Sequence, residues 1–537
     1  MCRYLPGSLT RMVGPAVIGV ILTSPATGCR SASAPEEKAD LQALVSGKSL
    51  GRRAAVPAEV RSAVKKFYEL RGYSFAWSAD RSRAAADQGL AAIDQAAAHG
   101  LEPAWYGYEE LESARHQIAE RKPKGDAGRR EIAQFDVRLT TSLMMLGRDV
   151  AIGHTRPRRW RAQRKLPDLV QSLSNARNAM SWLDAIRPPH EAYVGLQKAL
   201  AALRGVEAKG GWPRVSSGRT KASRQTLVRR LEMSGDLDPR ATVTPVAIRD
   251  ALESFQSHHG LSVSGRLDSA TLAAMNVPLD ARIRQVRTNL ERWRWMPDDL
   301  GDRRIMVNIP EFHLKAIDGD REALDIRAIV GRAGDETPVL SEDMTTVVFS
   351  PYWNIPETIA TDETLPEIAN DPGFLERNNI EVVRAGAKGP EVVDATALDW
   401  NDAETLEGFS LRQRPGSQNA LGLVKFLFPN PHNVYVHDTP ADHLFSRIGR
   451  TFSHGCIRIE QPIALAQYVL RDQRQWTPEV IQQAMNAGEE RQVKLTEPIP
   501  VHLTYFTAWT DAKGGLNFRD DVYGYDGEPK ALQMTRR

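Results

Sequence analysis

The chain has 537 residues, a length that favours three or four domains. Hydrophobic residues make up 42% and charged residues 26%, which is an ordinary globular composition with ample material for cores. The 70 basic and 67 acidic side chains leave a formal net charge of only +3, so nucleic acid is not expected as a partner.

The first residues have the pattern of an export signal. Arg3 and Arg11 precede an apolar run from Val13 to Leu22, and small residues follow. About 10 residues are too few to span a bilayer core, which needs about 20, but they suit the apolar part of a signal peptide. We therefore predict a signal peptide over residues 1–28 and a periplasmic protein, with an uncleaved N-terminal anchor as the alternative.

Cysteine usage draws attention to one thiol. The chain has three cysteines, Cys2 in the signal, Cys29 at its edge and Cys456 near the C-terminus. The run Ala26–Cys29 is similar to a lipoprotein cleavage box, although Ala26 stands where Leu is usual, so a membrane tether through a lipidated Cys29 is one open interpretation. If Cys29 is lipidated or removed, Cys456 has no disulfide partner, and a single leftover thiol in an exported protein is a candidate for reactivity. The alternative for Cys456 is a small buried hydrophobic residue.

Helical patterns follow the signal. Residues 29–56 are rich in Ser, Ala, Gly and charge, and we predict a tether there. Residues 57–205 carry apolar side chains three to four positions apart, as in Val60, Val64 and Phe67, which predicts a helical scaffold domain.

A compact unit of three helices is expected over residues 221–277. The pattern predicts helices at Thr226–Met233 and Val246–His258, and a third behind Asp268, a good N-cap residue. Residues 278–300 then carry a connecting helix, with apolar residues on one side and arginines on the other.

The period of the apolar residues changes from 3.6 to 2 in the C-terminal part. Ile305, Val307 and Ile309 alternate with other residues, and later segments behave similarly, so residues 301–512 are predicted to be mainly β, followed by a tail over 513–537. Helical and loop-like sequence with several prolines interrupts the strands between about 357 and 418. We expect this insertion to form a lid over the site described next.

The residues that carry chemistry lie close together in the sequence. A predicted strand delivers His437 to its tip, and a polar loop leads to Ser453-His454-Gly455-Cys456. Thiolate is the nucleophilic form of cysteine, and an imidazole can take the thiol proton and return it to a leaving amine. Backbone N–H groups at Gly455 and Cys456 are candidates for an oxyanion site. Arg458 is suited to a forked interaction with a substrate carboxylate.

Each of these residues also has a purely structural interpretation. A histidine at a strand end is commonly structural, and we favour a structural role for His454. Ser453 either hydrogen bonds within the loop or orients a histidine, and Arg458 is equally suited to an internal salt bridge. Together with the sole cysteine of the mature chain, the set favours acyl transfer. No cluster of metal ligands is present in the sequence, and no cofactor is needed.

The segment from His437 to Arg458 resembles the signature of the L,D-transpeptidases, in which a histidine precedes Ser/Thr-His-Gly-Cys and a final Asn or Arg. Other segments resemble the large YcbB-type branch of that family, among them VNIPEFHL (307–314), SPYWNIP (350–356), RPGSQNALGLVKFLFPN (414–430) and VKKFYELRGYSFAW (64–77).

The three-helix unit has its own resemblance. FQSHHGLSVSGRLDSATLAAMNV is similar to a small peptidoglycan-binding domain, in which Phe255, Gln256, Gly260, Leu261, Gly265 and Thr271 match. It departs at Ser264, where that family usually has Asp, so a bare three-helix spacer is the alternative.

The resemblance implies a multidomain α+β protein: a helical scaffold with an embedded peptidoglycan-binding module, and a mainly-β YkuD-like catalytic domain with a lid. It implies that Cys456 attacks the carbonyl of diaminopimelate in a tetrapeptide stem, that D-Ala leaves, and that the amine of another stem resolves the thioester. His437 would be the base, and the Gly455 and Cys456 backbone the oxyanion site. Such an enzyme needs no metal or cofactor.

Four other interpretations of the same residues are open. Water as acceptor would make the protein an L,D-carboxypeptidase, and a lipoprotein lysine would make it an anchoring enzyme. Papain-like peptidases are less well matched because they place Cys before His in the chain. A non-catalytic wall-binding scaffold is disfavoured by the intact pair of Cys456 and His437.

Overall fold

The structure is a computed structural model of the whole chain. It describes residues 35–46, 56–77, 83–155, 164–216, 220–371, 373–386, 389–398, 400 and 408–527, so the predicted signal peptide and Cys29 lie outside the described residues. The chain divides into two compact units, residues 1–154 with 165–188, and residues 155–164 with 189–537. Within the described ranges, no helix is both long and apolar enough to cross a membrane.

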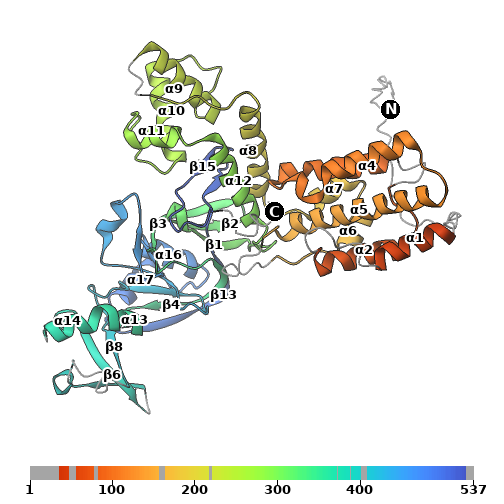
Figure 1. Cartoon of the computed structure of the whole chain (residues 1–537). Coiled ribbons are helices and arrows are strands. Elements are labelled where there is room, and N and C mark those ends of the chain that lie inside the picture. Colours follow the sequence, from red (N-terminus) through yellow and green to blue (C-terminus); the bar gives the residue numbers. More distant parts are fainter. Residues whose placement is uncertain are drawn as a thin grey trace, which may run out of the picture. The chain divides into compact units, whose positions relative to one another are not determined.

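The first unit is helical, as predicted. Its helices are α1 (Pro35–Ser46), α2 (Ala58–Leu70), α3 (Arg83–Asp94), η2 (Gln95–His99), η3 (Pro103–Tyr106), α4 (Tyr108–Arg121), α5 (Gly125–Ile152), α6 (Leu169–Asn175) and α7 (Ala179–Ile186). The long helix α5 contacts α1, α2, α3, α4, α6 and α7, and so runs through the middle of this unit (Figure 1).

The buried carboxylate of Asp136 holds the segment VKKFYELRGYSFAW (64–77) in place. Asp136 of α5 accepts hydrogen bonds from the hydroxyl of Tyr68 at 2.6 Å and from the backbone amides of Ala76 and Trp77. The indole of Trp77 in turn donates to Thr140, one turn further along α5. The segment VKKFYELRGYSFAW therefore fixes the turn after α2 against α5.

The predicted tether over residues 29–56 is wrong for its described part. Helix α1 lies within it, and the side chains of Leu41 and Val45 are buried in the core of the first unit. Arg129 of α5 pairs with Asp40 and Glu36 of α1. Composition suggested an unstructured segment because two buried apolar residues in twelve give a weak pattern, whereas tertiary packing decides the outcome.

The three-helix module forms α9 (Lys221–Ser234), α10 (Pro245–His258) and α11 (Ser269–Met275). The first helix begins five residues earlier than predicted because Thr220 and Ser223 make a capping box. Gln256 is fully buried, and its amide nitrogen donates to Ser264, Arg266 and Thr271. Its amide oxygen accepts from the backbone of Ser264 and Gly265. The residues that match the peptidoglycan-binding family thus hold the module's own loop together.

The predicted connecting helix is present as α12 (Leu279–Trp293). Helix α8 (Glu191–Glu207), which the sequence assigned to the scaffold over residues 57–205, packs on α12 and lies in the second compact unit. Tyr193 and Leu196 of α8 share a core with Val286 and Leu290 of α12, which is why this helix belongs there.

The C-terminal part is mainly β, as predicted. Among the described residues, nine strands form one sheet in the order β11-β3-β12-β10-β9-β4-β13-β1-β2, and β2 also pairs with β3, which closes the sheet on itself. Their bounds are β1 (Arg303–Asn308), β2 (His313–Asp318), β3 (Arg321–Gly331), β4 (Leu340–Phe349), β9 (Val424–Leu427), β10 (Val436–His437), β11 (Thr451–Ser453), β12 (Ile457–Ile459) and β13 (Arg491–Thr504). Short turns η4 (Ile309–Glu311) and η7 (Asp442–Ser446) and helices α16 (Pro462–Leu470) and α17 (Pro478–Met485) complete the domain. Figure 1 shows α16 and α17 beside the sheet, and Leu465 and Ile481 of the two helices belong to its hydrophobic core.

The insertion contains strands that its sequence did not reveal. Helical pieces α13 (Glu357–Ile359), η5 (Ala360–Thr364), α14 (Leu365–Asn370) and α15 (Phe374–Arg377) precede β6 (Ile380–Gly386), β7 (Gly389–Val393), η6 (Ala395–Ala397) and β8 (Phe409–Gln413). With β5 (Trp353–Asn354) these strands form a second sheet in the order β5-β8-β6-β7. The expectation of only helical and loop-like structure was wrong because the prolines of this stretch stand outside the buried run Ile380–Val383.

Residues 513–527 are not a free tail, contrary to the prediction. They include β15 (Leu516–Phe518), which pairs with β14 (Ala508–Thr510). Beyond it, Asp526 forms an ion pair with Arg292 at 2.7 Å, and the hydroxyl of Tyr523 donates to the carbonyl oxygen of Gly331 at 2.6 Å. These partners are about 200 residues away in the sequence, so no local sequence pattern predicts the contacts.

Candidate active site

Two short parallel strands bring the predicted site residues onto one face of the sheet. β10 and β12 pair with Val436 opposite Ile457 and His437 opposite Arg458, and the amide of Ile457 donates to the carbonyl of Tyr435. Val436 and Ile457 are fully buried in the core. Because alternate residues of a strand point to opposite faces, Tyr435, His437, Cys456 and Arg458 share the other face.

The loop before Cys456 is held by a network of hydrogen bonds. Gly455 has φ = 105°, a conformation that residues with a Cβ rarely adopt, which explains glycine here. The Ser453 hydroxyl donates to the carbonyl of Cys456 at 2.5 Å and accepts from the amide of Gly455 at 3.2 Å. Thr337 donates to the carbonyl of Gly455 at 2.8 Å, and its own amide donates to the hydroxyl of Tyr523. Ser453 therefore shapes the loop, and the amide of Gly455 is already engaged.

The Cys456 thiol is half-buried, and Tyr435 on the same face influences its pKa. Burial raises the pKa of the thiol, while the hydrogen bonds from Tyr435 and the charge of Arg458 oppose that rise. The thiol is therefore uncharged at neutral pH.

His437 is buried, with 3% of its surface exposed. Its Nδ1 donates to the carbonyl oxygen of Asp438 at 2.5 Å, so Nε2 is the ring nitrogen that can take a proton. Burial lowers the pKa of His437 to about 3, and the positive charges of Arg458 and Lys425 act in the same direction. The hydrogen bond from the ring to the carbonyl of Asp438 opposes this shift only partly. His437 is thus a neutral imidazole, the form that can accept a proton.

Arg458 carries a charge that the surrounding protein does not neutralise. Among the described residues it forms no salt bridge, and its buried Nε has no hydrogen-bond partner. The alternative of an internal salt bridge is therefore not supported by the structure. A guanidinium on the same face as the thiol is suited to an anionic group brought by a ligand.

His454 faces away from the thiol and toward the insertion. Its Nε2 lies 2.7 Å from a carboxylate oxygen of Glu363 in η5 and 2.8 Å from Nη2 of Arg332. Arg332 also pairs with Glu363 at 3.3 Å and with Asp335 at 2.7 Å. The insertion thereby contacts the catalytic loop two residues before Cys456.

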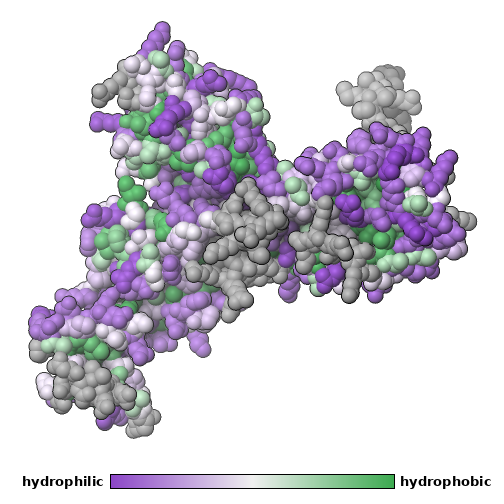
Figure 2. Space-filling view, in the orientation of Figure 1, coloured by the Kyte–Doolittle hydropathy of each residue, from purple (hydrophilic) through white to green (hydrophobic). Residues whose placement is uncertain are grey.

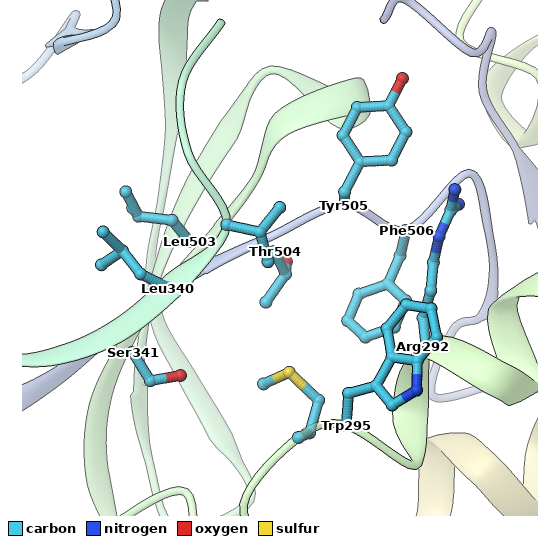
Figure 3. Close-up of a pocket in the computed structure, with 10 residues that line it drawn as sticks. Arg292, Trp295, Leu340, Ser341, Leu503, Thr504, Tyr505 and Phe506 are labelled. Carbon is cyan, nitrogen blue, oxygen red and sulfur yellow. The ribbon is translucent and has the colours of Figure 1, made fainter. Parts of the chain in front are cut away.

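A small cavity elsewhere in the domain does not compete with this site. It has a volume of about 20 Å³, which is room for one water molecule. Figure 3 shows Arg292, Trp295 and Phe506 on one side of it and Leu340, Ser341 and Leu503 on the other. Large apolar side chains are mostly buried, and the face seen in Figure 2 is mainly hydrophilic. Within the part of the chain that the structure describes, no group of three or more His, Cys, Asp or Glu side chains is placed to hold a metal ion.

The sequence missed three contributors to this site, Tyr435, Glu363 and Thr337. Tyr435 stands two residues before His437 on a strand, so the period of two could have identified it as a neighbour on the same face. Glu363 and Thr337 lie about 90 and 120 residues from the loop they contact, and only the fold reveals them.

Comparisons with known proteins match three parts of the chain. Residues 302–485 match the model of the L,D-transpeptidase catalytic domain, YkuD, residues 62–200 that of the Scaffold domain, and residues 220–275 that of the "Putative peptidoglycan binding domain". A curated protein of Haemophilus influenzae named "Putative L,D-transpeptidase" is 32% identical over 248 residues, which are 46% of this chain. That alignment spans 49% of the relative, about half its length.

Proposed function

We propose that this chain, which carries a YkuD-type L,D-transpeptidase catalytic domain, forms peptidoglycan cross-links between diaminopimelate residues by acyl transfer through Cys456. The observation that carries the proposal is the shared face of β10 and β12, where a thiol, a neutral imidazole and an unpaired guanidinium lie together. The match of residues 220–275 to a peptidoglycan-binding model supports the substrate class.

The protonation states favour general-base catalysis over a preformed ion pair. Thiol and imidazole are both uncharged in the resting site, so the proton moves as the sulfur attacks. The bond from Sγ to the donor carbonyl forms, the thiol proton passes to His437, and the bond to D-Ala breaks as His437 protonates the departing amine. The acceptor amine then attacks the thioester, an amide bond forms, and its proton returns through His437 to the sulfur.

The hydrogen bond between His437 and the thiol forms in this account when substrate binds. Catalytic hydrogen bonds are often incomplete in free enzymes and tighten in the complex. Tyr435 adjoins the base as well, with its ring 5.7 Å from that of His437.

Other groups of the site bind charge on the substrate. The amide of Gly455 is bonded to Ser453, so we assign the oxyanion chiefly to the amide of Cys456. Arg458 binds a carboxylate of the stem. We propose that the insertion over residues 357–418 acts as a lid, and its contact from Glu363 to His454 supports a position beside the thiol.

The substrate implies an address outside the cytoplasm. We propose that the protein is exported to the periplasm by the signal over residues 1–28, and that a lipid on Cys29 tethers it to the membrane. Palmitate labelling of cells tests the tether. Label that is lost in Cys29→Ala supports it, and label that persists in this variant excludes Cys29 as the anchor.

The reaction is tested with purified protein and disaccharide tetrapeptides from peptidoglycan. We expect cross-linked dimers joined through two diaminopimelate residues, together with free D-Ala, and neither product with Cys456→Ser. Mass spectrometry distinguishes the acceptors, because water gives tripeptides without dimers and a lysine-containing peptide gives a mixed product. Dimers formed equally well by Cys456→Ser would contradict the proposal.

A further inference from the structure

A second cation faces the base from the opposite side to Arg458. β9 pairs with β10 so that Lys425 lies opposite His437, and β10 pairs with β12 so that Arg458 lies opposite His437. Cross-strand partners point to the same face of a sheet, so the imidazole stands in a row between two positively charged side chains. Neither the signature segment nor the comparisons assign a role to Lys425.

The environment of Lys425 leaves its charge only partly compensated. Its side chain is 14% exposed, and its Nζ donates to the carbonyl oxygen of Tyr352 at 3.1 Å. The carboxylate of Glu490 lies 3.9 Å away and is also bound by the backbone amide of Tyr352 at 2.9 Å. Burial lowers the pKa of Lys425, and the negative charge of Glu490 opposes this shift only partly.

Tyr352 also connects Lys425 to the point where the insertion leaves the sheet. Tyr352 immediately precedes β5, which pairs with β8 of the insertion. The guanidinium of Arg412 lies over the ring of Tyr352, 4.2 Å from its centroid. Asn419 joins the two ends of the insertion, since its side-chain amide donates to the carbonyls of Pro351 and Arg414. Lys425 therefore lies between the base and the point where the insertion leaves the sheet.

The other groups around His437 do not cancel the two cations. On its own strand, Tyr435 is uncharged, and the carboxylate of Asp438 is turned to the backbone amides of Leu423 and Thr439. Cys456, which precedes β12, is uncharged, and the β4 partner of Lys425 is Val348, which carries no charge.

We propose that Lys425 is a positioning residue for the transfer reaction. From β9 it places a second positive charge beside that of Arg458, which disfavours protonation of the imidazole in addition to its burial, and through Tyr352 it connects His437 to the start of the insertion. The role rests on the proposed function of His437 as the base. A carboxylate of the stem on Arg458 neutralises one of the two charges, so the imidazole gains proton affinity in the complex, when it must carry the thiol proton.

The test compares Lys425→Met with Lys425→Arg, which keeps the charge, and with Lys494→Met, a matched change of an exposed lysine on β13 of the same sheet. The first readout is the single-turnover rate of Cys456 acylation by a β-lactam between pH 2 and 9, a range that includes the His437 pKa of about 3. We expect the acid limb of this profile to move to higher pH in Lys425→Met, and to stay in place in the other two variants.

The second readout does not depend on catalysis. Histidine labelled with ¹³C at Cε1 gives one signal for each of the 12 histidines, and the spectrum of His437→Gln identifies that of His437. We expect the His437 signal to titrate at higher pH in Lys425→Met than in the wild-type protein, and at lower or equal pH in Glu490→Gln.

Two results distinguish a failure of the role proposed for Lys425 from a failure of the proposed function. A rate that falls equally at every pH in Lys425→Met, with an unmoved His437 titration, would overturn the proposal and leave Lys425 a structural residue. A shifted His437 titration in a protein whose Cys456 is never acylated would support the effect of Lys425 on His437 and contradict the proposed function instead.

Discussion

Gln256 of the module and Arg458 beside Cys456 both have buried polar atoms, but the two side chains differ in their hydrogen bonds. In the module, both polar atoms of the Gln256 amide are bonded, to Ser264, Gly265, Arg266 and Thr271. On the β10–β12 face, Nε of Arg458 has no partner among the described residues, and His437 and Cys456 are both held uncharged.

The difference indicates which polar residues are structural and which are chemical. A buried polar group with all its hydrogen bonds made stabilises the loop around it. A polar group left incomplete costs free energy, and it is a candidate for completion by a ligand where it shares a face with reactive groups, as Arg458 does with Cys456. On this basis Gln256 maintains the fold of the module, and we expect Arg458 to bind a ligand.

The largest expected effect separates the two histidines. His437→Ala should slow acylation of Cys456 by about 10²–10⁴-fold because it removes the proton acceptor. His454→Ala should slow it far less, because His454 is bonded to Glu363 on the insertion. Single-turnover acylation rates measure both.

The reverse order of the two acylation rates would contradict the roles assigned to His437 and His454. A His454 variant slower than the His437 variant would mean that the insertion brings His454 to the thiol during the reaction. Unchanged melting temperatures serve as the control that neither loss is a loss of folding.

The next effect concerns the module. Gln256→Leu should destabilise it by about 1–3 kcal/mol for each buried backbone partner left unsatisfied, and should leave acylation of Cys456 by a small β-lactam unchanged. Limited proteolysis of the region around residues 205–220 and thermal unfolding measure the loss. Ser264→Ala is the matched milder change, since it removes only hydroxyl contacts of 3.2 and 3.3 Å. A module as stable with leucine as with Gln256 would contradict the structural interpretation.

Sequence patterns predicted the elements whose apolar period is locally complete. The helices of the module and α12 were placed to within a few residues, and the change to a period of two located the catalytic sheet. The site could be predicted for the same reason, because Ser453 to Arg458 are contiguous in the sequence and His437 ends the neighbouring strand.

What the sequence did not predict depends on distant partners. Helix α1 is stabilised by burying Leu41 and Val45 against residues far along the chain. Residues 513–527 are ordered by Arg292 and Gly331, and through Tyr523 they support Thr337 and hence the catalytic loop. Tyr435 is a different case, since its neighbours are local and the period of the strand was available.

A smaller effect is expected at Tyr435. Tyr435→Phe removes the hydroxyl that bonds the thiol, an interaction of about 0.5–1.5 kcal/mol, so acylation should change by about 2–12-fold. The same change raises the pKa of the Cys456 thiol, because a hydrogen bond to the thiolate is lost. The pH dependence of alkylation by iodoacetamide measures this, and a pKa that falls in the variant would contradict the assigned hydrogen bond.

The smallest effect is expected at the insertion. Glu363→Gln removes the charge that pairs with Arg332 and His454, and partly exposed pairs of this kind contribute about 0–1 kcal/mol. Acylation by a small β-lactam should change less than about 5-fold, whereas hydrogen exchange of residues 360–365 should accelerate. Unchanged exchange would show that Glu363 does not hold the insertion to the catalytic loop.

The proposed function requires a covalent bond between the sulfur of Cys456 and an acyl group. A carbapenem presents a strained amide to the thiol, and intact-protein mass spectrometry followed by peptide mapping locates the adduct. We predict one adduct per chain, mapped to the peptide that contains Cys456 and absent from Cys456→Ser. An adduct on another residue, or an equal adduct on Cys456→Ser, would contradict the assignment of this face as the active site.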